Sequence, residues 1–134
     1  TGPNACYSPL IAVQGWPQCQ STCADLGASM LCIRSPEEYD FVSTTCLSTD
    51  FASCWRWVDM TYDATTLEAE WACPSTFPTV WYSNFPKTLS DHNYMALGFR
   101  GAYGGTMINT PTPWMWATCM CQRDPAARRH LRLQ

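Results

Sequence analysis

The 134-residue chain has nine cysteines but lacks the spacings that mark a metal site. No C-x-x-C pair occurs, and the two histidines, His92 and His130, are too far apart to form an H-x-x-x-H pair. Structural zinc sites usually carry one of these patterns. Nine cysteines in so short a chain favour disulfide bonds in an oxidising compartment over reduced or metal-bound thiols. We therefore expect a disulfide-stapled, secreted or extracellular protein without a zinc site.

The chain also lacks an apolar run of 18 residues and a secretory leader. The first absence argues against insertion into a membrane. The second leads us to expect a mature protein or a domain excised from a larger chain.

Charge is scarce and unevenly placed. Residues 123–134 carry four arginines and one aspartate, a net charge of +3, while the preceding residues carry −6. An acidic body argues against nucleic acid as a partner. We interpret residues 1–122 as one domain and residues 123–134 as a basic tail or linker, with a polyanion contact as the alternative to a solvated terminus.

The order of helical and extended patterns predicts an α+β fold. Residues 5–14 read as a strand, residues 16–26 as a helix and residues 28–33 as a short strand. A second helix begins after Ser35, the expected N-cap, with Glu38 completing a capping box. Beyond it, short apolar runs alternate with Pro-, Ser- and Thr-rich stretches, which favours antiparallel sheets flanked by the two helices.

Residues 72–92 form a long segment with three prolines and no regular period. A loop of this length in a compact domain is usually functional or disordered, and the tryptophan-rich surroundings argue against disorder. Glu68 and Glu70, just before it, fit the exposed edge of a hairpin better than a catalytic carboxylate pair. Residues 99–106 are glycine-rich and, with no helix following, fit a hairpin connection better than an anion cradle.

Two pairs of cysteines match each other in spacing. Cys119 and Cys121 lie two residues apart and share one face of a predicted strand. Cys19 and Cys23 lie four residues apart and share one face of the predicted helix. Both separations are about 6–7 Å. We therefore expect two disulfide rungs, Cys23–Cys121 and Cys19–Cys119, between the helix and the last strand.

Residues 16–42 combine a tryptophan at the start of a helix, a helix cysteine, a Leu-Gly-Ala turn and a Ser-x-Glu-Glu start of the next helix, and they resemble the start of a C-type lectin-like domain. The resemblance continues in WVDM (57–60), WYSNFP (81–86) and CMCQ (119–122), and it covers roughly residues 5–122. That family links its first helix to its last strand through a disulfide, which here corresponds to Cys23–Cys121.

The resemblance implies specific roles for several aromatic residues. The family buries the tryptophans that correspond to Trp57, Trp71 and Trp81. We also expect Trp114 and Trp116 to pack on the strand face opposite Cys119 and Cys121.

The calcium motifs of the family are missing. Its sugar-binding members hold Ca²⁺ with Glu-Pro-Asn or Gln-Pro-Asp in the long loop and Asn-Asp in a later strand. This chain has Phe85-Pro86-Lys87 in the loop and Met107-Ile108-Asn109 in the strand. Calcium needs six to eight oxygen ligands, and only Asn109 offers a suitable side chain. We expect no calcium and no other cofactor. The family bends its loop at a cis proline, and Pro86 stands at that position.

The remaining cysteines leave one thiol unpaired. Cys46 and Cys54 flank the loop after the second helix and are candidates to close it, while the pairing of Cys32 and Cys73 stays open. Cys6 matches a family position whose partner lies further upstream, so we expect it to be free or to bond outside this chain.

We place the candidate ligand-binding surface on the long loop. A polar, proline-rich loop has little core of its own, so its aromatic rings are candidates for stacking on a ligand. The candidate residues are Phe77, Tyr82, Phe85, Lys87, Asp91, His92 and Asn109. Asp91 and His92 are also a conceivable acid–base pair, but no third group at a suitable spacing completes a catalytic triad, and we do not expect an enzyme.

Two functions fit these residues. The first is an extracellular recognition module that binds a protein or an assembly partner through the long loop, with Cys6 as a possible covalent link. The second is a lectin with an unconventional, calcium-independent glycan site on the same loop. The missing metal motif favours the first, and the fold does not decide between them.

Overall fold

The described residues form two helices and eight short strands in the computed structural model. The structure describes residues 5–11, 15–46, 54–88, 91–99, 103–111 and 117–123. In chain order the elements are β1 (Cys6–Tyr7), α1 (Trp16–Asp25), β2 (Ser29–Met30), α2 (Pro36–Ser43), β3 (Trp55–Trp57), β4 (Met60–Asp63), β5 (Glu68–Trp71), β6 (Tyr94–Gly98), β7 (Met107–Thr110) and β8 (Cys121–Arg123).

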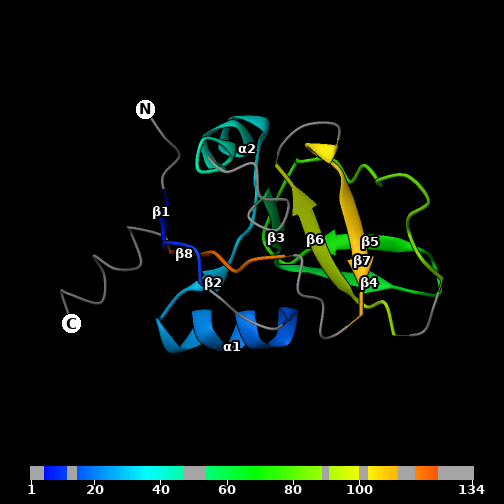
Figure 1. Cartoon of the computed structure of the whole chain (residues 1–134), viewed down its shortest axis with the longest axis horizontal. Helices are drawn as coiled ribbons and strands as arrows, with labels where there is room; N and C mark the ends of the chain where they lie inside the picture. Colours follow the sequence, from blue (N-terminus) through cyan, green and yellow to red (C-terminus); the bar gives the residue numbers. More distant parts are fainter. Residues whose placement is uncertain are drawn as a thin grey trace.

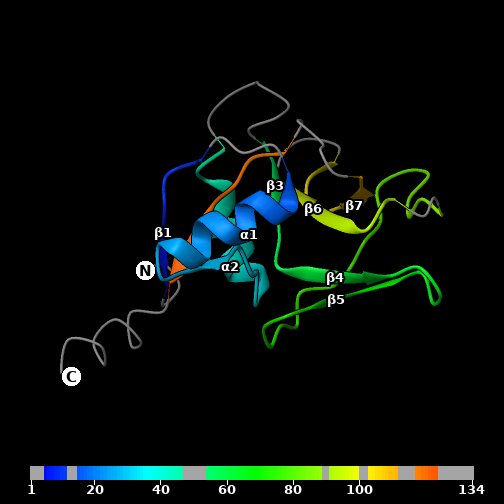
Figure 2. The same cartoon turned by 90° about the horizontal axis from the view of Figure 1, so that it is seen from below.

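The strands form three small antiparallel sheets (Figure 1). The ends of the domain lie together, because β8 pairs with β1 on one side and with β2 on the other. A second sheet has the order β3-β6-β7, and β4 pairs with β5 as a hairpin. Figure 2 shows both helices beside the sheet of the chain ends, with the β4–β5 hairpin at the far side of the molecule. The predicted α+β fold is confirmed.

Two predicted strands are shorter than expected. Of residues 5–14, only Cys6–Tyr7 forms a strand, and Ile11 makes an isolated bridge to Cys119. Pro9 lies between them and cannot donate a ladder hydrogen bond, which explains the break. Of residues 28–33, only Ser29–Met30 pairs with β8.

Glu38 caps α2 differently from the predicted box. The Ser35 hydroxyl accepts from the Glu38 N–H at 3.2 Å, as expected. The Glu38 carboxylate, however, accepts from the Arg34 N–H at 2.7 Å and from the Tyr7 hydroxyl. The side chain is buried, so it joins β1 to the start of α2 rather than serving the helix alone.

Both predicted rungs are present. Cys19 bonds Cys119 and Cys23 bonds Cys121, with Cα–Cα separations of 5.5 and 5.4 Å. All four side chains are buried. The predicted match between helix and strand spacing is therefore confirmed.

Two further disulfides complete the pairing of eight cysteines. Cys46 bonds Cys54 and closes the connection after α2, as one of the open alternatives had it. Cys32 bonds Cys73 and fixes the start of the long loop to the segment after β2. Cys6 is free and exposed on β1.

The core is rich in tryptophan. Trp57 is fully buried on β3, as predicted, while Trp71 and Trp81 are partly buried and pack against the core. Trp114 and Trp116 lie outside the described residues. Trp55 is also buried and stacks on Tyr103 at 4.9 Å between ring centroids.

Both predicted hairpins are present. β6 pairs with β7 across the glycine-rich connection, of which residues 99 and 103–106 are described. At Gly98 an added Cβ would lie 2.5 Å from the Tyr103 carbonyl oxygen, so the turn requires glycine there. Glu68 and Glu70 lie exposed on β5.

None of the helices in the described part of the chain is long and apolar enough to cross a membrane. β8 extends to Arg123, the first residue of the predicted tail, and residues 124–134 lie outside the described ranges. The predicted boundary between domain and tail stays a prediction.

Candidate functional site

The long loop is fixed along the outer edge of β7. The Tyr82 N–H donates to the Met107 carbonyl at 2.9 Å, and the Met107 N–H donates to the Val80 carbonyl at 2.7 Å. Trp81 thereby forms a parallel bridge to Met107, and its side chain packs inward. The Phe85–Pro86 peptide bond is cis, as in the family that the sequence resembles. The loop is therefore held against the sheet by main-chain bonds.

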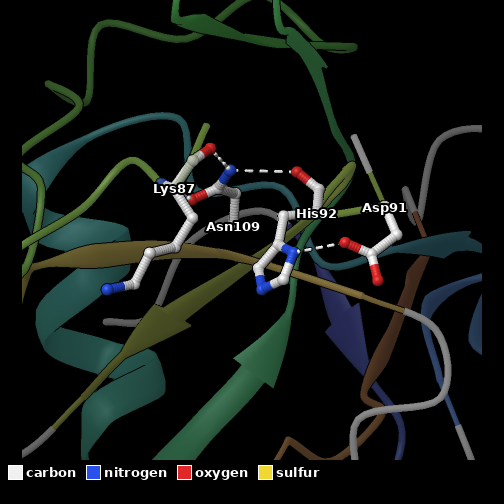
Figure 3. Close-up of polar contacts among 4 residues, drawn as sticks. All are labelled: Lys87, Asp91, His92 and Asn109. Atoms are coloured by element: carbon white, nitrogen blue, oxygen red, sulfur yellow. Dashed lines mark hydrogen bonds and ion pairs between the residues drawn. The ribbon is translucent and has the colours of Figure 1, made fainter. Parts of the chain in front are cut away.

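Asn109 on β7 holds the next part of the loop (Figure 3). Its Oδ1 accepts from the Lys87 N–H at 2.7 Å, and its Nδ2 donates to the Lys87 carbonyl at 2.8 Å. The same Nδ2 donates to the His92 carbonyl at 2.9 Å. Because Asn109 is fully buried, it positions Lys87 and His92 and does not itself reach a ligand.

His92 and Asp91 form an ion-pair contact beside this amide. His92 Nδ1 lies 2.8 Å from Asp91 Oδ1, with the histidine side chain 17% and the aspartate side chain 70% exposed. A carboxylate accepts hydrogen bonds, so the Nδ1 proton points at Asp91 and Nε2 points away from it. Among the described residues, no hydroxyl hydrogen-bonds to His92.

Two aromatic rings and the Lys87 ammonium lie next to one another on the loop. The Tyr82 and Phe85 ring centroids are 6.5 Å apart, and Lys87 Nζ lies 5.0 Å from the centroid of Phe85. Tyr82 is exposed, and its ring meets that of the buried Trp55 in a T-shaped arrangement, with 5.9 Å between the ring centroids. The ring of Tyr82 is thus in contact with the core and accessible to solvent.

Phe77 has a different environment. Its ring stacks on Tyr39 of α2 at 5.2 Å, and it packs against the core. Its carbonyl accepts from the Trp71 indole N–H at 3.2 Å. The structure therefore gives Phe77 a packing role, because a polar loop still needs an anchor where it leaves β5.

The sequence pattern missed one exposed residue. Val80 is 49% exposed, which is high for an apolar side chain. Since Trp81 faces inward, its neighbours Val80 and Tyr82 face outward, as in any extended segment. This alternation could have identified Val80. We call Val80, Tyr82, Phe85, Lys87, Asp91 and His92 the loop site.

The donor set around Asn109 does not fit calcium. Phe85 and Ile108 have no side-chain oxygen, and the Asn109 oxygen already accepts a hydrogen bond from Lys87. A hard divalent cation takes six to eight oxygens, and the nearby Lys87 would repel it. The sulfurs of Cys19, Cys23 and Cys119 also lie close together, but all three are engaged in disulfides.

Comparison with known proteins identifies the fold. No family model matches the chain, and no curated protein matches it. Solved structures do match. The mouse scavenger receptor C-type lectin carbohydrate-recognition domain aligns with a TM-score of 0.70 at 15% identity, over 92% of this chain and 93% of that one.

Two calcium-independent proteins are similar to the same extent. A calcium-independent type II antifreeze protein aligns with a TM-score of 0.70 at 14% identity, over 92% of this chain and 89% of that one. The Ca²⁺-independent C-type lectin SPL-2 from Saxidomus purpuratus aligns with a TM-score of 0.69 at 18% identity, over 94% and 91%. The chain therefore has the C-type lectin-like fold.

Proposed function

We propose that this chain is a non-enzymatic extracellular recognition module that binds a glycan at the loop site without calcium. The observation that carries the proposal is the arrangement around Asn109. The buried Asn109 amide does not serve as a metal ligand. It fixes the backbone of Lys87 and His92 through hydrogen bonds. A site fixed in this way needs no metal to be ordered.

The loop site offers the contacts that a sugar requires. The exposed ring of Tyr82 provides an apolar face, with the partly buried Phe85 beside it, and Lys87, Asp91 and His92 provide polar groups at its border. Two proteins of the same fold support this assignment by their names. One is the SPL-1 complex with GlcNAc, and the other is the Ca²⁺-independent lectin SPL-2.

A protein or assembly partner is the second candidate. The exposed Val80 and Tyr82 favour it, because aliphatic and aromatic side chains on a rigid loop are typical of interface hot spots. Both candidates use the same residues and differ only in the chemistry of the ligand.

A glycan array tests the proposal. The purified domain is screened in Ca²⁺ and again in EDTA, together with Tyr82→Ala and with the control Leu26→Ala, which removes another exposed apolar side chain, at the end of α1. The proposal predicts binding that survives EDTA, is lost in Tyr82→Ala and is retained in Leu26→Ala. Binding that EDTA abolishes would contradict the metal-free site, and no binding in either condition would favour a protein partner.

A further inference from the structure

We infer that the glycan recognised at the loop site is anionic, carrying a carboxylate or sulfate group that pairs with Lys87. The inference rests on the proposed function and adds the chemical class of the ligand. It begins from the position of Lys87, whose backbone is bonded to the buried side chain of Asn109.

The backbone of Lys87 is fixed more firmly than that of an ordinary loop lysine. Its N–H and its carbonyl both bond the side chain of Asn109, at 2.7 and 2.8 Å. Asn109 is itself fully buried on β7, between β6 and the loop. The origin of the lysine side chain is therefore fixed, which lowers the entropy lost when its ammonium binds a ligand.

The positive charge of Lys87 is not neutralised by the part of the chain that the structure describes. The ion pair found there is that of His92 with Asp91, and no described carboxylate lies within ion-pair distance of Lys87 Nζ. The ammonium instead lies over the ring of Phe85 at 5.0 Å. A cation–π contact orients the ammonium without cancelling its charge, so Lys87 remains available to an anion.

His92 provides a second polar group on the same side. Asn109 Nδ2 donates to the carbonyl of Lys87 and to the carbonyl of His92, so these two residues are neighbours in space. In Figure 3 the side chains of Lys87 and His92 extend in the same direction from the backbone groups that Asn109 holds. Asp91 lies on the other side of the imidazole from Lys87. His92 Nε2 is thus free to bond a sugar hydroxyl, while the negative charge of Asp91 is directed away from the Lys87 side.

Three contacts define the expected ligand. The Lys87 ammonium binds the anionic group, His92 Nε2 binds a neighbouring hydroxyl, and the exposed ring of Tyr82 contacts the apolar face of a sugar. A neutral sugar would leave the Lys87 charge unpaired on ligand binding, which makes it the weaker ligand.

Affinity measurements in EDTA test this inference. The probes are a hyaluronan octasaccharide, which carries carboxylates, a chondroitin sulfate octasaccharide, which also carries sulfates, and a neutral chito-oligosaccharide. We expect the wild-type domain to bind one or both anionic probes at least about tenfold more tightly than the neutral one. The stronger anionic probe shows whether a carboxylate suffices or a sulfate is needed.

Variants separate a specific contact from general charge. Lys87→Gln should lose about tenfold in affinity for the anionic probe, and Lys87→Arg should retain most of it. Arg34→Gln removes one exposed positive charge elsewhere and should have little effect. Equal losses in Lys87→Gln and Arg34→Gln, or a preference for the neutral probe, would overturn the inference and leave glycan binding intact. Failure to bind any saccharide would overturn the proposed function itself.

Discussion

The side chain of Asn109 bonds both backbone polar groups of Lys87, accepting from its N–H at 2.7 Å and donating to its carbonyl at 2.8 Å. This paired arrangement resembles the exchange of hydrogen bonds between two strand residues. The Asn109 side chain thus takes the place of a main-chain partner for Lys87. The loop site owes its order to this contact, and the first prediction concerns it.

Replacing Asn109 should weaken both the fold and the site. Asn109→Ala removes the partner of three part-buried main-chain groups of Lys87 and His92, which should lower the free energy of unfolding by about 2–4 kcal/mol. Asn109→Asp keeps the acceptor but places a carboxylate against two carbonyl oxygens, so it should be no more stable than the alanine variant. Urea denaturation measures both, with the exposed Thr88→Ala as control. An Asn109→Asp variant of wild-type stability would contradict the assigned hydrogen bonds.

The first disulfide rung to be removed should cost less stability than the second, whichever rung it is. Either bond alone closes a loop of about a hundred residues, so the second adds only a short cycle. Removing Cys19 and Cys119 together, as alanines, should lower the free energy of unfolding by about 2–3 kcal/mol, and removing both rungs by about 7 kcal/mol. Denaturation midpoints of the two variants measure the difference. Additive losses of equal size would contradict the loop-closure account.

Asp59 should lower stability at neutral pH. Burial raises the pKa of its carboxyl above the ordinary value, and no described side chain hydrogen-bonds to it. A folded-state pKa above the unfolded one means that stability is greatest when the carboxyl is protonated and falls as pH rises through the folded pKa. Asp59→Asn should therefore be more stable than wild type at pH 7 and similar to it below about pH 4. Denaturation of Asp59→Asn at both pH values measures the gain in stability, with the exposed Asp40→Asn as control. A gain of equal size at both pH values would contradict a raised pKa of Asp59 as its cause.

Tyr7 should matter for stability more than its half-exposed position suggests. Its hydroxyl donates to the buried Glu38 carboxylate, and burial, with that carboxylate nearby, raises the pKa of the phenol. Tyr7→Phe should cost about 1.5–3 kcal/mol, because the lost hydrogen bond has a charged acceptor. Tyr39→Phe is the matched control, since it loses a bond to the neutral Gly98 carbonyl and should cost less. Thermal melts of the two variants provide the comparison.

The same raised pKa predicts the alkaline limit of wild-type stability. Because the folded state disfavours the phenolate, stability should fall as pH rises above about 10, where the unfolded tyrosine ionises. The fall should be smaller in Tyr7→Phe. An unchanged alkaline profile in that variant would show that Tyr7 is not the responsible group.

Cysteine spacing predicted more of this fold than any other signal. The rise per residue of a helix and of a strand gives the pairs Cys19/Cys23 and Cys119/Cys121 similar separations. The two pairs can therefore bond each other and hold the helix against the strand. Cys32–Cys73 could not be predicted in this way, since Cys73 lies in an irregular loop whose path has no period. The capping role of Glu38 was only half predicted, because its second partner, Tyr7, is distant in sequence.

The candidate site was predicted by composition rather than by geometry. Tyr82 and Phe85 stood out as aromatic residues in a polar loop, and Phe85 lies next to both Tyr82 and Lys87. Phe77 met the same criterion but packs on Tyr39 of α2, a contact that depends on where the helix lies. The buried position of Asn109 likewise follows from the pairing of β6 with β7 and from the path of the loop.

The location of the site is the central claim, and a titration followed by ¹H–¹⁵N correlation spectra tests it most directly. The labelled domain is titrated in EDTA with the glycan that binds most tightly. We predict the largest shifts in the backbone amides of Val80, Tyr82, Phe85, Lys87 and His92 and in the side-chain amide of Asn109. Shifts confined to the β4–β5 hairpin or to the sheet of the chain ends, with these signals unmoved, would contradict the account.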